Sequence, residues 1–466
     1  AWHKLCRCMI GLFYNKPDQV QESLQGPKGV YEMLRHGFRD DGFWLEGSIP
    51  YQFAATSPLL KIAEILENAE YPTSLYEFQT ADGRTLKQSY DALFALLFPN
   101  RTLPAIGDCY ARRPHLGQHP DWEILYRRFR EPRYAWLLKD APTKSKTALF
   151  EGVPALPNVS PSGQTSRLWP EQGYAALRSN EGVKYWTGEG WTLFTTFSNA
   201  PVHQNADKLS IMLFAAGHLW LPDCEAKSSA EHAFSSSIQS GLNRETLCHN
   251  TLLVDHKSQR HPDRRLDLIE YHALPEAKRI SVGDLDGRLY EGVRQLRTCV
   301  VRNEYVLDFF QAESDKDRAF CWLTHVDAQP TASMEGEWRE LSSSHGGPHH
   351  YLKNIRGLWP KVSVYWENFT HNERHFRMDV VGSNSFGVIR CGFPLDDSRD
   401  PETMPMRLLQ IDGSEAWFAA VYQCGSKQPE SVEIHVKRGP VHSWEVHVRR
   451  DQQTLVHRVP ILTDLP

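Results

Sequence analysis

Side chains able to do chemistry gather in three short stretches of the chain, residues 201–210, 221–223 and 248–251. They supply two histidines, an amide and two carboxylates: His203, Asn205, Asp207, Asp223 and His249. Apolar runs typical of strands adjoin them, and strands hold side chains rigidly. Because an imidazole near neutral pH can be a base, an acid or a metal ligand, these stretches indicate a reaction site. An ordinary histidine-rich β region is the alternative, since the chain has 21 histidines.

A second informative stretch, residues 40–53, reads DDGFWLEGSIPYQF. It predicts a turn at residues 41–42, then aromatic side chains, then the start of a helix. Loops that enter helices often carry functional residues. The phenol of Tyr51 could protonate a leaving oxygen or remove a proton. The plainer interpretation is a packed tyrosine whose hydroxyl is satisfied by a hydrogen bond.

Composition limits the classes of protein to be considered. A chain of 466 residues with 41% hydrophobic residues predicts two or three well-packed domains. The net charge of −5 argues against general affinity for nucleic acid, and no apolar run is long enough to span a membrane. Nine irregularly spaced cysteines do not indicate a disulfide framework. Cys6 and Cys8 are too close together for a zinc ribbon and are interpreted as helix residues.

The chain begins directly in an amphipathic helical pattern at Ala1, with no signal peptide. We therefore expect that the beginning of the protein, and any localisation signal, has been removed.

Hydrophobic periodicity divides the chain into a helical half and a strand-rich half. Helical spacing is found over residues 20–38, 57–69, 86–97 and 122–138, and a linker rich in Pro, Ser and Gly follows at 154–164. Strand patterns follow at residues 174–178, 192–197, 298–310, 374–380, 416–422, 431–436 and 442–448. This order predicts segregated α+β domains.

The order of the motifs resembles the heparinase II/III-like polysaccharide lyases over essentially the whole chain. Residues 41–51 read Asp-Gly-aromatic-aromatic-x-Glu-Gly-Ser-x-x-Tyr, and residues 203–210 read His-x-x-x-Asp-x-x-Ser. Asp223 and a His-Asn-Thr triplet at 249–251 follow in the expected order. Residues 29–34 (GVYEML) and 103–108 (LPAIGD) are similar to further landmarks of the family.

The resemblance implies a fold and a location. Residues 1–160 would form an incomplete (α/α) toroid, truncated at its N-terminus. Residues 161–385 would form a central antiparallel β-sandwich and residues 386–466 a smaller C-terminal β-sheet. The resemblance places the substrate between toroid and sandwich, and implies a periplasmic or secreted protein; it leaves a homodimer open.

The resemblance also implies β-elimination of a uronic-acid polysaccharide such as alginate, ulvan or a glycosaminoglycan. The sugar carboxylate must be neutralised, a base must remove the C5 proton, and an acid must protonate O4. By motif position, Tyr51 falls on the catalytic tyrosine of the family and His203 on its catalytic histidine. For one configuration at C5, the two would act from opposite faces of the sugar. For the other, Tyr51 could do both jobs from one face.

Relatives hold a structural zinc ion at the positions of Asn205, Asp223 and His249, but with a histidine in place of Asn205. A neutral amide is a poor zinc ligand, so the resemblance implies weakened zinc binding and no organic cofactor. The alternatives are that the set holds a cation weakly or is held by hydrogen bonds. His249 could also simply cap the ends of strands.

The resemblance implies that the group that neutralises the substrate carboxylate would precede Ala1 in this numbering. The candidates for contact with the anionic polysaccharide are Gln52, Glu46, Arg112, Arg113 and Arg244. Arginine binds carboxylates through two hydrogen bonds, although an Arg-Arg pair is more often a solvated loop. The basic run over residues 257–265 is either a polyanion contact or a solvated loop.

Two other functions stay open. Asp41 and Glu46 could be the paired carboxylates of a glycoside hydrolase on the same scaffold. The altered metal set also fits a non-catalytic relative that only binds glycans. Ultraviolet absorbance of an unsaturated product separates a lyase from both.

Overall fold

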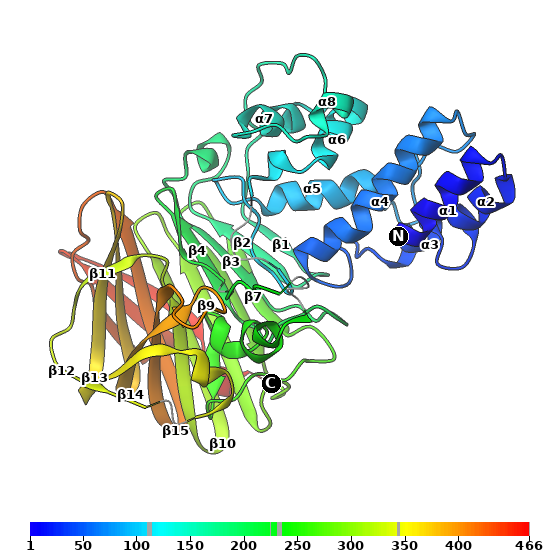
Figure 1. Cartoon of the computed structure of the whole chain (residues 1–466). Coiled ribbons are helices and arrows are strands. Elements are labelled where there is room, and N and C mark those ends of the chain that lie inside the picture. The colour runs from blue at the N-terminus through cyan, green and yellow to red at the C-terminus, as the bar shows by residue number, and fades with distance from the viewer. Residues whose placement is uncertain (110–113, 224, 231–234, 343–344, 466) are drawn as a thin grey trace. The chain divides into compact units, whose positions relative to one another are not determined.

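The protein is described by a computed structural model that covers residues 1–109, 114–223, 225–230, 235–342 and 345–465 (Figure 1). Contacts divide the chain into two compact units. The first unit contains Ala1–Gln164 together with two returning segments, Trp169–Gln172 and Ala200–Gln204. The second contains the remaining residues, to the C-terminus. The segment that carries His203 therefore belongs to the helical unit, and the three-domain division stays a prediction.

The first unit is built from helices, as its periodicity predicts (Figure 1). They are α1 (Trp2–Phe13), α2 (Pro17–Gln25), α3 (Val30–His36), α4 (Ile49–Asn68), α5 (Leu86–Leu96), α6 (Asp121–Phe129), α7 (Pro132–Asp140) and α8 (Ala148–Glu151). Two of the long predicted helices are broken. The first is divided between α2 and α3 at Gly26 and Pro27, and the second ends before Pro132, because proline cannot donate the hydrogen bond that continues a helix.

Helix α4 begins earlier than its apolar periodicity predicts. Ser48 precedes it in an extended conformation, and Pro50 lies in its first turn, where the missing N–H costs nothing. Further along the helix, Leu59, Leu60 and Ile62 are fully buried and anchor it in the unit. Tyr51 therefore lies in the first turn of a well-packed helix, at the end where the loop over residues 40–48 enters.

The second unit is dominated by antiparallel sheets, which confirms the predicted strand-rich half. One sheet has the order β1-β2-β3-β4-β5, with β1 (Arg167–Trp169), β2 (Tyr174–Arg178), β3 (Thr192–Thr196), β4 (Ile211–Ala215) and β5 (His218–Leu221). A large sheet has the order β11-β13-β14-β15-β10-β9-β8-β7, with β12 beside β13 and β6 beside β10. Its strands are β6 (Leu252–Val254), β7 (Asp267–Ala273), β8 (Lys278–Asp284), β9 (Val293–Val301), β10 (Val306–His325), β11 (Gln329–Ser333), β12 (Glu337–Glu340), β13 (Lys353–His371), β14 (Arg374–Pro394) and β15 (Thr403–Gly425).

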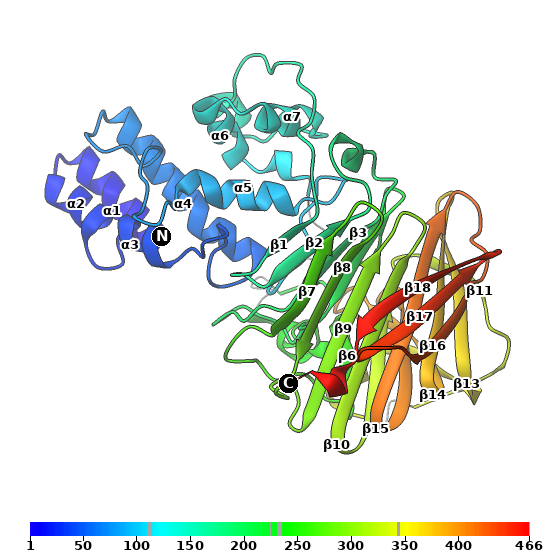
Figure 2. The same ribbon diagram turned by 180° about the vertical axis from the view of Figure 1, so that it is seen from behind.

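Alternating side chains of β10 show how these sheets pack. Phe310 and Trp322 belong to one core with Leu193 and Leu213 of the first sheet, whereas Phe309 faces a different core. That second core is closed by a small sheet of β16 (Glu433–Arg438), β17 (Ser443–Arg450) and β18 (Gln453–Pro460), which lies across one face of the large sheet (Figure 2). Strand β15 belongs to the large sheet, so the separate C-terminal sheet begins only at Glu433.

Across the described residues, no helix combines the length and the apolar character needed to cross a membrane.

Candidate functional site

The two residues to which the sequence gives chemical roles lie in direct contact within the first unit. The rings of Tyr51 and His203 are stacked, with centroids 3.5 Å apart and planes inclined by 14°. Tyr51 is half-buried, and 27% of the His203 side chain is exposed. A phenol and an imidazole in contact, both partly open to solvent, form a pair that can supply an acid and a base.

A buried carboxylate, that of Asp108, contacts the imidazole of His203. Oδ2 of Asp108 lies 2.9 Å from Nδ1 of His203, and Asp108 is fully buried. In the sequence, residues 103–108 stand out only as a landmark, and no role is predicted for Asp108. The two residues are 95 positions apart in the chain, so no local spacing could reveal the contact.

Main-chain bonds hold the same segments together. The amide of Asp108 donates to the carbonyl of His203 at 2.9 Å, and the Ser48 hydroxyl donates to the carbonyl of Asp108 at 2.8 Å. Gly107 has a φ of 64°, and a Cβ atom there would lie 2.4 Å from the carbonyl oxygen of His203. Only glycine permits this close approach. Because Ser48 directly precedes α4, these bonds fix the start of α4, which carries Tyr51, relative to the loop that carries His203.

Gln52 has a structural position. It is only 2% exposed, and its Nε2 donates to the carbonyls of Gly42 and Ser89 at 3.1 and 3.2 Å. Its Oε1 accepts from the amide of Trp44. Because both amide hydrogens and the oxygen are bonded to the main chain, the geometry gives no support to the predicted contact between Gln52 and a substrate.

The other predicted substrate contacts are scattered. Glu46 is half-buried and lies within electrostatic range of the Ala1 amino group. Arg112 and Arg113 lie outside the described residues. Arg244 is half-buried in the second unit, where its carbonyl accepts from the Ala206 amide at 2.9 Å.

The carboxylates proposed for a hydrolase are not equivalent. Asp41 accepts a hydrogen bond from the Gln172 amide at 2.8 Å, and burial raises the pKa of its carboxyl group. Asp41 therefore holds the returning segment at residues 169–172 in place. This role makes a paired function with Glu46 less plausible than the Tyr51 and His203 pair.

The basic run over residues 257–265 is partly neutralised by acidic side chains of the same unit. Arg260 pairs with Glu291 at 2.8 Å, and Arg264 pairs with Asp286. All four side chains are well exposed, as in an ordinary solvated surface. These pairs favour the solvated-loop interpretation over a dedicated polyanion patch.

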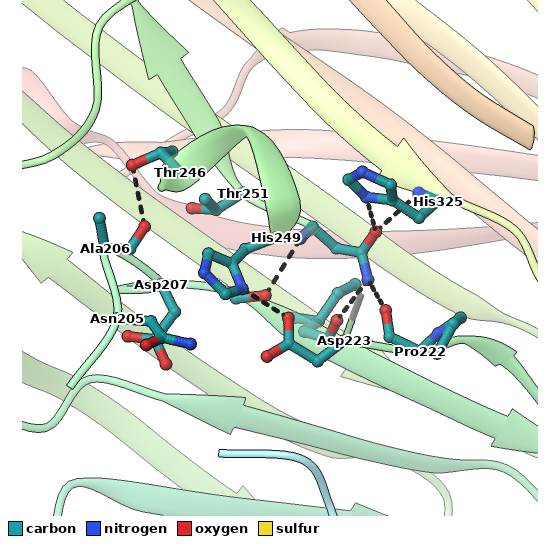
Figure 3. A network of polar contacts seen from close by, with 12 residues as sticks. Asn205, Ala206, Asp207, Pro222, Asp223, Thr246, His249, Thr251 and His325 are labelled. Atoms are coloured by element: carbon teal, nitrogen blue, oxygen red, sulfur yellow. Dashed lines mark hydrogen bonds and ion pairs between the residues drawn. The ribbon is translucent and has the colours of Figure 1, made fainter. Parts of the chain in front are cut away.

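The predicted metal set lies in the second unit, in a buried polar network (Figure 3). Nδ1 of His249 is 2.6 Å from Oδ1 of Asp223, and both side chains are buried, as is Asn205. Burial disfavours the His249 imidazolium, but the neighbouring Asp223 carboxylate outweighs this effect and raises its pKa. Nε2 of His249 is buried and makes no hydrogen bond to any residue that the structure describes.

The network contains its own cation. Nζ of the buried Lys208 donates to the Asn205 carbonyl at 3.0 Å and to Oδ1 of Asp207 at 2.5 Å. Nearby, Asn250 donates to the carbonyls of Ile211 and Pro222 and accepts from the main-chain amide of His325 (Figure 3). Burial is the main cause that lowers the pKa of His325 to about 3, so its ring is neutral.

These residues do not fit a zinc ion as they stand. Within the described ranges, no group of three or more His, Cys, Asp or Glu side chains is placed to hold a metal. The imidazole and carboxylate of the predicted set already bond to each other, and Asn205 offers only a neutral amide. Hydrogen bonding within the set accounts for Nδ1 of His249 and for Asp223, whereas Nε2 of His249 has no hydrogen-bond partner among the described residues.

We expect Asn205→His to increase zinc binding, because an imidazole would restore a nitrogen ligand beside His249 and Asp223. Metal analysis after dialysis against zinc measures the effect, with Asn303→His on the exposed surface as the matched control. Equal zinc content in the wild type and in both variants would show that position 205 does not limit metal binding.

Comparison with known proteins finds one family model and several solved structures similar to this chain. Residues 161–344 match the family described as "Heparinase II/III-like, C-terminal". Two similar solved structures are heparinase III (12% identity, TM-score 0.74, 98% of this chain and 66% of that chain) and heparan sulfate lyase HepC from Pedobacter heparinus (14%, 0.71, 98% and 65%). The chain thus spans less than two thirds of the length of either structure. No curated protein sequence matches it. The chain is thus similar in fold to these structures over nearly its whole length, and residues 161–344 match the family that the motifs resemble.

Proposed function

We propose that this protein is a polysaccharide lyase that cleaves a uronic-acid-containing anionic polysaccharide by β-elimination. The contact between the Tyr51 phenol and the His203 imidazole is the observation that carries the proposal. The family match and the heparinase III-like fold support the same class of enzyme. On the same grounds, the helical unit is proposed to be an incomplete (α/α) toroid, and the protein to act in the periplasm or outside the cell.

The proposed step moves one proton at each end of the breaking bond. His203 removes the proton from C5 of the uronate, and the electron pair of the C5–H bond becomes the C4–C5 double bond. The C4–O4 bond breaks, and O4 takes the hydroxyl proton of Tyr51. The products are a new non-reducing end with an unsaturated ring and a shortened chain with a free hydroxyl.

The stacked rings favour attack from one face of the sugar. A pyranose ring between two flat groups needs roughly 7 Å between them, twice the van der Waals separation of about 3.5–4 Å. The ring centroids of Tyr51 and His203 are only 3.5 Å apart. Both side chains are therefore proposed to approach the substrate from the same side, with His203 as base and Tyr51 as acid.

Attack from one face selects the configuration of the substrate. In D-glucuronate and D-mannuronate, the C5 hydrogen and O4 lie on the same face of the ring. In L-iduronate and L-guluronate, the inverted C5 places them on opposite faces. The first pair is the proposed substrate class. Arg112, Arg113 and Arg244 stay the proposed partners of its carboxylate, and a homodimer stays a proposal.

Replacing Tyr51 by phenylalanine removes a single oxygen, so we expect Tyr51→Phe to abolish elimination while the fold is kept. Absorbance of the unsaturated product measures the reaction on a panel of uronic polysaccharides, and circular dichroism checks the fold. Tyr14→Phe, at an exposed tyrosine, is the control. Substantial turnover by Tyr51→Phe would remove Tyr51 from the mechanism.

Loss of the proposed base should also be severe. We expect His203→Ala to lower kcat on the order of 10²–10⁴-fold, the usual contribution of a positioned general base. His36→Ala, at an exposed histidine of α3, should leave kcat unchanged. A His203→Ala variant with near-normal kcat would show that another group removes the proton.

Attack from one face of the sugar predicts a substrate preference. Polymannuronate and unsulfated glucuronate polymers should be cleaved much faster than polyguluronate and iduronate-rich dermatan. Initial rates of absorbance increase at equal uronate concentration give the comparison. Faster cleavage of the C5-inverted polymers would contradict same-face attack, whereas new reducing ends without absorbance would favour a hydrolase. Binding without either signal would favour a non-catalytic glycan-binding protein.

A further inference from the structure

The hydrogen bond between Asp108 and His203 determines which ring nitrogen carries the proton. The Asp108 carboxylate is fully buried, and a buried carboxylate is stable only when its oxygens accept hydrogen bonds or pair with a cation. An ionised carboxylate cannot donate, so beside an ionised Asp108 the donor across the 2.9 Å contact is Nδ1 of His203. A neutral imidazole protonated on Nδ1 keeps its lone pair on Nε2.

The position of this carboxylate is fixed by its own main chain. The amide of Asp108 is bonded to the His203 carbonyl and its carbonyl to the Ser48 hydroxyl, so main chain and side chain both hold the loop of His203. His203 itself has a φ of 57°, a conformation that a non-glycine residue rarely adopts without support from its surroundings. The exposed part of the imidazole is thus held by a buried partner that cannot move away.

We propose that Asp108 is a positioning residue that keeps His203 in the Nδ1–H tautomer, with Nε2 as the atom that accepts the C5 proton. This inference rests on the proposed lyase function and deepens it. In the resting state the carboxylate orients the ring. After proton transfer, the same negative charge stabilises the imidazolium that has formed, so the step gains an electrostatic contribution that substrate binding does not.

The variant Asp108→Asn changes the hydrogen bond to His203 without changing the size of the side chain at position 108. An amide has the shape of the carboxylate, but its NH₂ group can donate to Nδ1 and so stabilise the other tautomer, in which Nε2 carries a proton and cannot act as a base. We expect kcat to fall on the order of 10²–10⁴-fold, as general-base catalysis is lost, while KM changes less than about 2-fold. Asp108→Glu, which keeps the charge, should recover part of the lost kcat.

A matched control is needed to show that loss of kcat does not come simply from removing any buried carboxylate. Asp121 is buried in the same unit and accepts from the hydroxyls of Ser57 and Tyr90, both at 2.6 Å. Asp121→Asn also removes a buried negative charge but does not touch His203. If Asp108→Asn lowered kcat no more than Asp121→Asn, the effect would be structural and the positioning role would be refuted.

Nitrogen-15 NMR of histidine-labelled protein reads the tautomer without any substrate. The signals of His203 are identified as those lost in His203→Gln. We expect protonated Nδ1 and unprotonated Nε2 in the wild type, and a changed pattern in Asp108→Asn. A wild-type ring protonated on Nε2 alone would overturn the proposal even if Asp108→Asn failed to fold.

The two proposals fail in different ways. A wild-type protein with the expected tautomer but without unsaturated product on any uronic polymer would refute the lyase function and leave only the orientation of His203 by Asp108 in place. An active wild type whose Asp108→Asn variant keeps full kcat would refute the positioning role alone.

Discussion

The candidate site depends on one constraint, the close approach of the loop that ends at Asp108 to the loop that carries His203. The approach is possible because Gly107 has no side chain, and it is held by an amide–carbonyl bond and a carboxylate–imidazole bond. Ser48 extends the same bonds to the start of α4. Three segments distant in sequence are thereby fixed relative to one another, and the aromatic contact of Tyr51 with His203 follows from that arrangement.

The sequence carries the parts of this site that depend on local pattern. Tyr51 stands just after a turn and in the first turn of a helix, and His203 lies ahead of a strand, so both were identifiable from motif and periodicity. The role of Asp108 depends on a contact over 95 positions, which no local pattern encodes. Gln52 shows the opposite case. Its type and its position beside Tyr51 predict a ligand contact, but its side-chain amide is hydrogen-bonded to main-chain groups.

In the fold, too, some features follow from local sequence and others depend on contacts between residues far apart in the chain. Gly26 and Pro27 follow the end of α2, and Pro132 begins α7 shortly after α6 ends, so these two breaks carry a signal in the sequence. The signal is not decisive, because α4 continues through Pro58. The long strands β10 and β15 exceed what period-two windows indicate, because their pairing over many residues sets their length. Likewise, the assignment of residues 200–204 to the helical unit is a property of contacts rather than of composition.

The polar network around Asn205 has a structural role inside the second unit, whereas the Tyr51 and His203 pair has the proposed chemical role. In the network, the charges of Lys208 and Asp207 meet directly and His249 is bonded to Asp223, so its polar groups stabilise one another inside the second unit. In the proposed reaction, elimination leaves a proton on His203 and removes one from Tyr51. Net transfer of one proton from the imidazolium to the phenolate, directly or through solvent, restores both for the next cycle. In this scheme the acid and the base regenerate each other, while Asp108 keeps the imidazole oriented.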